Sequence, residues 1–406
     1  MAEFEMIAKT FQGLEEVLAK ELVALGANNV QIGRRMVSFT GDKELMYKAN
    51  FHLRTAVRIL KPIMHFRAAD ADEVYEVIKA IDWEQYMDRN STFSVDSVVY
   101  SEVFRHSKFV AYRVKDAIAD YFNEKYGERP SVRLNNPDLI FHIHIAGEEC
   151  TLAFDSSGES LHRRGYRVET GAAPINEVLA AGLILLTGWD GECDFIDPMC
   201  GSGTPAIEAA MMAMNKAPGS LKGHFAFQSI KGYNRIIPGE KAPLVAPRQH
   251  IGATPEQIWK EMVLKSKENE KTDNLPEIIA TDISPEAVEN AHTNAIAAGV
   301  AQYITFKACD FGDTYVPDVD KKGAVFFNPE YGIRLGDPVE LAPIYERIGT
   351  FMNEKCSGWT GSLITGNPDL AKLVNLYYKK RVPFFNGPID CRLFVYEGCE
   401  LKGRIS

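Results

Sequence analysis

The sequence lacks the cysteine pattern of a disulfide-bonded or zinc-binding protein. Its 406 residues include 7 cysteines, an odd number, and no two of them are spaced as C-x-x-C. We therefore expect neither a disulfide framework nor a cysteine zinc cluster. Unpaired thiols are typical of a reducing compartment, so we expect a cytoplasmic protein.

A long apolar run and an excess of positive charge are also missing. The longest apolar stretch, Val178–Leu186, is far too short to cross a bilayer. Residues 1–10 include Glu3, Glu5 and Lys9, which is unlike a signal peptide. The formal net charge of -10 argues against nucleic-acid binding by bulk charge, although it leaves room for a local basic patch.

The patterns that are present divide the chain into two kinds of structure. With 46% hydrophobic residues the chain can form more than one core, and its length predicts two or three domains. Before about Arg167, strands and helices mix as in an α+β module. After it, strands and helices alternate as in a doubly wound parallel sheet, and 378–382 with 392–397 can form a terminal hairpin.

The sharpest motif is the run Phe195-Ile196-Asp197-Pro198-Met199-Cys200-Gly201-Ser202-Gly203-Thr204, in which an apolar strand leads into a glycine turn and a helix. Gly201 and Gly203 let the backbone approach a ligand closely, because they carry no Cβ. The run is not a dinucleotide fingerprint, since Ala206 occupies the third glycine position, and no G-K-[ST] follows it as in a phosphate-binding loop.

A second motif, Ala280-Thr281-Asp282-Ile283-Ser284-Pro285, places an acid at the end of the next strand. Ser284 and Pro285 are helix-start residues, and Asp282 can accept the hydroxyl groups of a ribose. The usual spacing from glycine turn to acid is roughly 20 residues. Here it is far longer, so we expect an inserted lobe at about 217–276 that lies at the surface and contains no sheet.

Two more strand ends carry polar residues. Cys309-Asp310-Phe311 follows the strand 303–307, and Asp310 could accept from an adenine amine. Asn328-Pro329-Glu330-Tyr331-Gly332 follows the strand 324–327. There an amide and main-chain carbonyls could grip an exocyclic amine while Tyr331 stacks on the base. Either segment could also be an ordinary turn.

These four elements, in this order, resemble class I S-adenosylmethionine-dependent methyltransferases that act on amino groups. With N-P-x-Y-G-x-R-L the resemblance extends to RNA methyltransferases that carry a THUMP domain, of the RlmL type, and to their stand-alone homologues labelled adenine-specific DNA methylases. Gly13-Leu14-Glu15 resembles the ferredoxin-like start of that family, and the segment 157–167 resembles its junction between THUMP and catalytic domains.

The resemblance implies a Rossmann-like α/β methyltransferase domain with a seven-stranded, mostly parallel sheet at 159–406. It is preceded by a ferredoxin-like subdomain at 1–60 and a THUMP RNA-binding domain at 61–158. The cofactor would be S-adenosyl-L-methionine. Its implied contacts are Asp197, Cys200, Gly201, Gly203, Thr204, Asp282, Ile283, Asp310, Phe311 and Asn328. The implied target-amine site is Asn328, Pro329, Glu330 and Tyr331.

Two positions depart from the family pattern. Asn176 stands where we would expect a lysine. Glu330 replaces the second proline of N-P-P-Y, which would loosen the loop and add a negative charge beside the amine site. That charge could bind the amine edge of guanine, be desolvated at some cost, or repel phosphate. We hypothesise reduced or altered activity.

Binding of RNA should depend on local basic residues. The densest cluster is Arg163, Arg164 and Arg167, and a looser one is Arg54, Arg58, Lys61 and Arg67. His142 and His144 share a strand face without a third ligand nearby, so we expect no metal site.

The resemblance points to an RNA-binding enzyme that is not embedded in a membrane. Its implied target is the N2 amine of guanine in 23S ribosomal RNA. One alternative is an adenine-N6 methyltransferase on DNA or RNA. A second is a protein that holds the cofactor and RNA with weak or no catalysis because of Glu330. A nicotinamide dehydrogenase ranks last, because the third glycine is missing.

Overall fold

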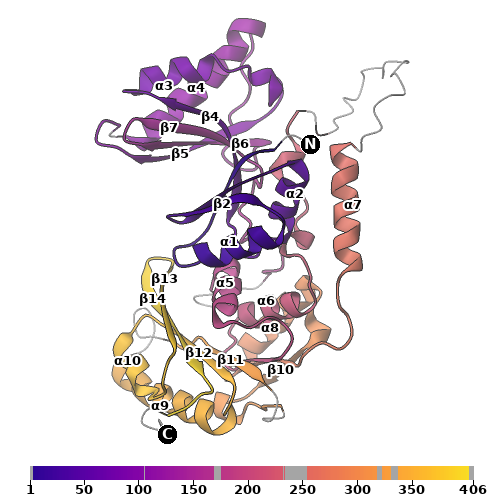
Figure 1. Ribbon diagram of the computed structural model, residues 1–406, viewed down its shortest axis with the longest axis vertical. Helices are drawn as coiled ribbons and strands as arrows, with labels where there is room; N and C mark the ends of the chain where they lie inside the picture. The colour runs from indigo at the N-terminus through magenta and orange to yellow at the C-terminus, as the bar shows by residue number, and fades with distance from the viewer. Residues whose placement is uncertain are drawn as a thin grey trace.

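The computed structural model of the chain describes residues 3–104, 106–168, 175–231, 233, 254–317, 322–330 and 337–401. Two seven-stranded sheets organise this part of the chain, with the order β2-β3-β1-β4-β7-β6-β5 in the first and β10-β9-β8-β11-β12-β14-β13 in the second. The first lies toward one end of the long axis and the second toward the other (Figure 1). No helix in the described ranges is both long and apolar enough to cross a membrane.

The N-terminal segment follows the βαββαβ order of a ferredoxin-like fold. Its elements are β1 (Phe4–Lys9), α1 (Glu15–Ala24), β2 (Asn28–Gly33), β3 (Met36–Gly41), α2 (Lys43–His52) and β4 (Arg58–Arg67). Antiparallel pairing of β1 with both β3 and β4 places the first strand in the interior of this half-sheet. Asp42 caps α2 by accepting a hydrogen bond from the Leu45 N–H at 3.0 Å.

The segment expected to be the THUMP domain extends the same sheet instead of forming a separate one. Its elements are α3 (Ala71–Lys79), the 3₁₀ turn η1 (Trp83–Gln85), β5 (Phe93–Tyr100), α4 (Ser107–Tyr126), β6 (Leu139–Ala146) and β7 (Glu149–Asp155). β7 pairs antiparallel with β4, and β5 pairs parallel with β6. The boundary expected between residues 60 and 61 therefore falls inside β4, which both modules share.

The second sheet has the mixed order predicted for a class I methyltransferase domain. Five strands run parallel, and β14 pairs antiparallel with both β12 and β13. The strands are β8 (Asp194–Asp197), β9 (Ile278–Asp282), β10 (Ile304–Ala308), β11 (Gly323–Phe327), β12 (Thr360–Thr365), β13 (Lys380–Asn386) and β14 (Ile389–Glu397). The helices are α5 (Glu177–Thr187), α6 (Thr204–Ala213), α8 (Pro285–Ala298), α9 (Pro338–Lys355) and α10 (Pro368–Leu373), with 3₁₀ turns η4 (Ala301–Tyr303) and η5 (Phe311–Asp313). The predicted α/β class and terminal hairpin are confirmed.

The expected insertion at 217–276 contains no strand among its described residues, as predicted, but it is not a free surface excursion. It forms the turns η2 (Pro218–Leu221) and η3 (Ala226–Gln228) and helix α7 (Pro255–Glu268), which runs beside α2 (Figure 1). Phe225 and Phe227 are buried in the core of the N-terminal sheet. The ring of Trp259 packs on Phe51, with centroids 5.3 Å apart. The insertion therefore joins the two halves of the molecule.

Candidate active site

The glycine turn after β8 is built for close approach of backbone and ligand. Phe195 and Ile196 are the buried side chains of the strand. In the turn, the Cys200 N–H donates to the Thr281 carbonyl of β9 at 2.9 Å. Gly203 has φ 80, and a Cβ there would lie 2.8 Å from the Cβ of Ala291 on α8. Gly201 has φ 51, and a Cβ there would meet nothing within 4 Å. The turn therefore packs tightly against α8 at Gly203 and leaves room for a ligand at Gly201.

Asp197 lies beneath this turn and is the most unusual acid of the site. It is fully buried, and neither carboxylate oxygen has a well-formed hydrogen bond among the described residues. Burial, followed by the charge of Asp282, raises its pKa well above the usual range, although the N–H groups of Ala206 and Met199 oppose the shift. A buried carboxylate without a full set of partners fits a ligand that places positive charge nearby.

Asp282 ends β9 and faces the glycine turn. Its carboxylate accepts from the Gly201 N–H and from the Ser284 N–H, both at 3.0 Å. Ser284 caps α8 by accepting from the Ala287 N–H, and Pro285 begins that helix, as predicted. Asp282 is half-buried and lines the cleft described below, where its remaining acceptor capacity is available to hydroxyl groups. Ile283 beside it is 73% exposed.

Asp310 and Phe311 lie at the start of η5, and both contact an arginine that sequence reasoning missed. Arg347 on α9 forms an ion pair with Asp310, and its guanidinium lies 4.6 Å from the centroid of the Phe311 ring. Burial alone would raise the pKa of Asp310, but hydrogen bonds from Arg347 and the Gly312 N–H, with the arginine charge, hold it below its usual value. Arg347 thus orients an acid predicted to bind adenine.

The loop after β11 is held by a buried tyrosine. Tyr345 on α9 donates to the Glu330 carbonyl at 3.1 Å, and its hydroxyl also lies 3.0 Å from the Thr365 hydroxyl at the end of β12. Asn328 and Pro329 line the cleft together with Glu330, whose side chain is exposed. Tyr331, the fourth predicted residue of this loop, lies outside the described residues.

All of these strand ends open into one cleft of about 1320 Å³. Of the residues predicted to contact the cofactor, all but Asp197 and Gly203 line it. Asp197 ends β8 just before the glycine turn, and Gly203 is the last residue of that turn. The arrangement fits the nucleoside and amino-acid parts of S-adenosylmethionine, since it offers an open glycine turn, a buried acid and two acids at neighbouring strand ends. No cluster of three or more potential metal ligands occurs in the described part of the chain.

The three arginines predicted to bind RNA have different surroundings. Arg163 is 68% exposed and pairs with Glu159 at 2.9 Å, at the edge of the cleft. Arg167 lines the cleft but donates to Glu177, to the Ile175 carbonyl and to the hydroxyl of Thr204, the first residue of α6. Arg164 is only 2% exposed, so its direct contact with RNA must be withdrawn.

Arg164 belongs instead to a buried group that holds α6. It donates to the carbonyls of Leu161 and Arg54 and pairs with Glu208 on α6 at 3.5 Å. Tyr166 donates to the same Glu208 oxygen at 2.9 Å. The Arg54 side chain reaches the Met211 and Lys216 carbonyls at the other end of the helix. The junction therefore fixes the helix whose N-terminus carries the glycine turn.

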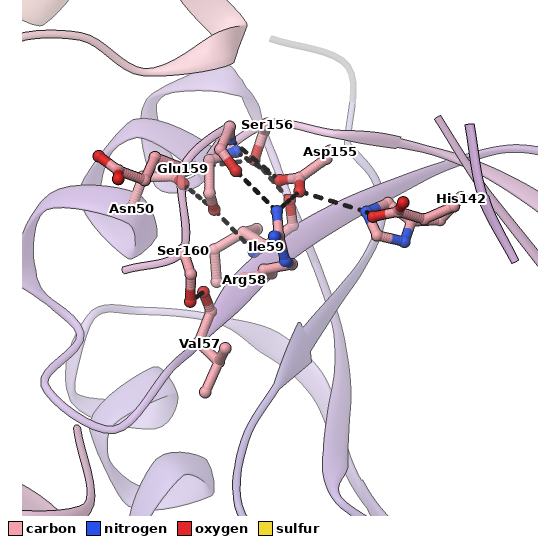
Figure 2. A network of polar contacts seen from close by, with 12 residues as sticks. Asn50, Val57, Arg58, Ile59, His142, Asp155, Ser156, Glu159 and Ser160 are labelled. Atoms are coloured by element: carbon pink, nitrogen blue, oxygen red, sulfur yellow. Dashed lines mark hydrogen bonds and ion pairs between the residues drawn. The ribbon is translucent and has the colours of Figure 1, made fainter. Parts of the chain in front are cut away.

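A second polar network ties the junction to the first sheet (Figure 2). The buried Asp155 pairs with Arg58 and lies 3.3 Å from a ring nitrogen of His142. Burial would raise the pKa of Asp155, but His142 and Arg58 outweigh it and hold that pKa below its usual value. The Arg58 guanidinium also donates to the Gly158 carbonyl at 2.6 Å. Arg58 therefore fixes the chain where it leaves β7.

The looser basic cluster does not form an open basic patch. Arg54 and Arg58 are engaged as described, and Lys61 lies 4.3 Å from the centroid of the Phe4 ring. Arg67 pairs with Glu148 and Glu149 at the sheet edge. The sequence shows the density of these cations, whereas their partners come from distant segments that only the fold brings close.

Comparison with protein families divides the chain into three matched segments. Residues 5–60 match the RlmL ferredoxin-like domain, and residues 68–155 match the THUMP domain. Residues 164–394 match the RMKL-like methyltransferase domain. The matches follow the same order as the predicted modules.

Three curated proteins are similar over nearly the whole chain. Ribosomal RNA large subunit methyltransferase K/L of Syntrophotalea carbinolica is 35% identical over 99% of this chain and 54% of its own length. The protein of the same name from Marinomonas is 36% identical over 95% of this chain and 51% of its own length. A Synechocystis protein named as a candidate RNA methyltransferase is 33% identical over 96% of both chains. The chain thus spans about half the length of the K/L proteins.

Several solved structures are similar to this chain over nearly its whole length. SMU.472, a candidate methyltransferase in complex with S-adenosylhomocysteine, has a TM-score of 0.82 and 28% identity, covering 99% of this chain and 100% of that one. A Listeria monocytogenes protein named as a candidate N6-adenine-specific DNA methylase has a TM-score of 0.82 and 29% identity, covering 98% of this chain and 97% of that one. TrmN from Thermus thermophilus, at 19% identity and a TM-score of 0.68, shares the fold.

Proposed function

Because the chain belongs to the RMKL-like methyltransferase family, we propose that it transfers the methyl group of S-adenosylmethionine to the N2 amine of a guanine in large-subunit (23S) ribosomal RNA. The names of its K/L relatives support the ribosomal substrate, and its THUMP match supports an RNA. The S-adenosylhomocysteine bound to SMU.472 supports the cofactor.

The cofactor's parts can be assigned to the strand ends. The open turn at Gly201, with Asp197 beneath it, would hold the methionine part, and Asp282 would accept the ribose hydroxyls. Asp310 would accept the adenine amine, with Phe311 beside the ring. Arg347 would keep Asp310 ionised and oriented for that hydrogen bond.

The observation that carries the proposal is the position of Asn328–Glu330 in the same cleft as the cofactor residues. An exocyclic amine is a poor nucleophile, because its lone pair is delocalised into the ring. The Asn328 side chain and the Pro329 carbonyl can accept its hydrogen bonds and direct the lone pair toward the methyl carbon, about 3 Å away at reaction. Bound S-adenosylmethionine supplies a methyl group activated by the sulfonium, and the amine proton leaves to solvent.

The shape of the molecule fits a large folded RNA. The THUMP elements α3, α4 and β5 lie at the far end from the catalytic sheet, with the ferredoxin-like elements between them (Figure 1). A single RNA that contacts both ends must extend over this whole length. With a net charge of -10, such binding should depend on shape and on local cations such as Arg163.

The test compares three polymers with one labelled cofactor. We expect transfer to protein-free 23S ribosomal RNA that lacks the modification, and little transfer to 16S ribosomal RNA or duplex DNA. Asn328→Ala should lower kcat by about 100-fold or more while S-adenosylhomocysteine binding changes much less. Preferred transfer to duplex DNA would overturn the proposed substrate and support the adenine-N6 alternative.

Glu330 motivates the alternative of a protein that binds cofactor and RNA but turns over slowly. The Tyr345 hydrogen bond to the Glu330 carbonyl holds the backbone at this position despite the missing proline. We therefore expect Glu330→Pro to change the choice between guanine and adenine more than the overall rate. A large gain in rate without a change of base would favour the slow-turnover alternative.

A further inference from the structure

The cleft is larger than the cofactor site needs. Pockets that enclose a drug-sized ligand have volumes of roughly 300–1,000 Å³, and this cleft measures about 1320 Å³. Beyond the strand ends, its walls come from three segments far apart in sequence. They are the N-terminal loop with Phe11, the junction with His162 and Arg163, and the β13–β14 hairpin with Phe385 and Asn386.

Phe385 is the side chain of this outer part whose placement the fold does not explain. It follows Phe384 along β13, so the two side chains point to opposite faces of the strand. Phe384 is 1% exposed and packs in the core of the catalytic domain, whereas Phe385 is 44% exposed and lines the cleft. Only the Phe384 ring packs in the core, so the Phe385 ring is available to a ligand.

The hairpin that carries Phe385 is stiff. Asn386 pairs with Ile389 across a two-residue turn, and Gly387 takes φ 61 at the first of these two positions, where a type II′ turn favours glycine. Pro388 follows and restricts the turn further. The backbone that carries Phe385 is therefore constrained before any ligand arrives.

The hairpin is also fixed against the loop that carries Phe11. A Cβ on Gly13 would lie 2.8 Å from the Pro383 carbonyl oxygen, so the two backbones touch there. The Leu14 N–H donates to the Phe11 carbonyl at 3.2 Å and closes the turn that contains Gly13. This contact places two aromatic side chains, from the two ends of the chain, on the same cleft.

The remaining outer walls suit an uncharged ring with a phosphate at its edge. Burial lowers the pKa of His162 and favours its neutral form, although Glu177 opposes the shift. Asn386 lines the same part of the cleft. The exposed Arg163 guanidinium lies at the edge with its partner Glu159, where a phosphate could approach it.

We propose that this outer part of the cleft binds the target nucleotide of the RNA, with the flipped-out purine stacked on Phe385 and Arg163 near its phosphate. The inference rests on the proposed function and deepens it by giving the base a position. Stacking on an aromatic ring tolerates any base, so Phe385 would provide affinity while the Asn328–Glu330 loop selects the amine.

The test measures RNA and cofactor separately in three variants: Phe385→Ala, Phe385→Tyr and Tyr377→Ala. Tyr377 is 61% exposed and lies outside the cleft, so its loss controls for removal of a surface ring. We expect Phe385→Ala to raise KM for 23S RNA about tenfold or more, with Kd for S-adenosylhomocysteine unchanged within twofold. Phe385→Tyr should restore KM, and Tyr377→Ala should match the wild type.

Two results would overturn the inference while the proposed function stands. The first is an unchanged KM in Phe385→Ala when the wild type methylates RNA. The second is an equal rise in KM in Tyr377→Ala. If the wild type binds S-adenosylhomocysteine but methylates no RNA, the proposed function itself fails, and the inference fails with it.

Discussion

Asp197 is the residue whose proposed role in cofactor binding most clearly opposes the stability of the cofactor-free protein. Its carboxylate is fully buried beneath the glycine turn, next to a second acid and without well-formed partners among the described residues. A charge in such a place costs free energy in the empty protein. A ligand that places positive charge in the neighbouring cleft would lower that cost, and the site would gain affinity from the same feature.

We predict that Asp197→Asn stabilises the cofactor-free protein near neutral pH and weakens cofactor binding. Since burial raises the folded pKa of Asp197, its stabilising contribution is present below the unfolded value of about 3.9 and is lost as pH rises through the raised folded value. The Asp197→Asn variant lacks this loss of stability with rising pH. Thermal unfolding of both proteins from pH 4 to 9, with titration of S-adenosylhomocysteine, measures both effects.

The exposed Asp313 provides the matched control. Asp313→Asn should leave S-adenosylhomocysteine affinity unchanged. Parallel pH profiles for wild type and Asp197→Asn would contradict the raised pKa, and unchanged cofactor affinity would contradict the role in binding.

Other residues show where sequence information ends. The acids at the strand ends were predictable, because an apolar strand followed by a polar residue is a local pattern, and the fold places Asp282 and Asp310 in one cleft. Arg164 was misplaced at the RNA surface, because R-R-G-Y-R looks the same whether its arginines are exposed or buried. Its partner Glu208 is 44 residues away, and Arg347 is 37 residues from Asp310.

At the scale of elements, helix α6 depends on the buried group at the junction. We predict that Arg164→Ala destabilises the protein by about 3 kcal/mol or more, because it removes the buried ion pair with Glu208. Arg163→Ala should cost less than about 0.5 kcal/mol, since it breaks only an exposed pair. Denaturant unfolding of the two variants measures this difference.

The same two variants separate RNA binding from folding. Arg163→Ala should weaken binding of 23S RNA and reduce its salt dependence, with cofactor binding unchanged. Equal destabilisation by both variants would contradict the buried role of Arg164. RNA binding unaffected by Arg163→Ala would remove Arg163 from the RNA surface as well.

The Gly13-Leu14-Glu15 motif shows how a short sequence joins elements that are distant in the chain. Leu14 is fully buried in the catalytic core, where a Cβ on Gly182 of α5 would lie 2.4 Å from its side chain. Gly13 touches the Pro383 carbonyl of β13. Glu15 accepts from the Gly13 N–H at 2.7 Å and the Arg35 N–H at 2.9 Å. The sequence indicated a family resemblance here, whereas the docking role depends on residues beyond 180.

We predict that Gly13→Ala disturbs RNA methylation more than its stability cost explains. Gly13 has φ 92, and Gly26, with φ 90, has the same backbone demand without the clash, because a Cβ added there would meet nothing within 4 Å. Both alanine variants should lose about 1–3 kcal/mol from backbone strain. Only Gly13→Ala should displace the hairpin and raise KM for RNA. Equal KM values in the two variants would contradict a hairpin held by this contact.

For the whole molecule, the sequence predicted the class and order of the modules but not how they join. Alternating strands and helices predicted the catalytic sheet, and the family match agrees with the resemblance found at the motifs. Local periodicity could not predict that β4 belongs to both N-terminal modules. Nor could it predict that helix α7 of the 217–276 segment packs on α2. Both depend on which apolar faces meet, and distant segments decide this.

The most direct test of the central claim identifies the methylated base. Purified protein is incubated with labelled S-adenosylmethionine and total RNA from cells that lack the gene, and the RNA is then digested to nucleosides. We predict label in N2-methylguanosine. Label in N6-methyladenosine, or no label in RNA from a protein that binds the cofactor tightly, would contradict it.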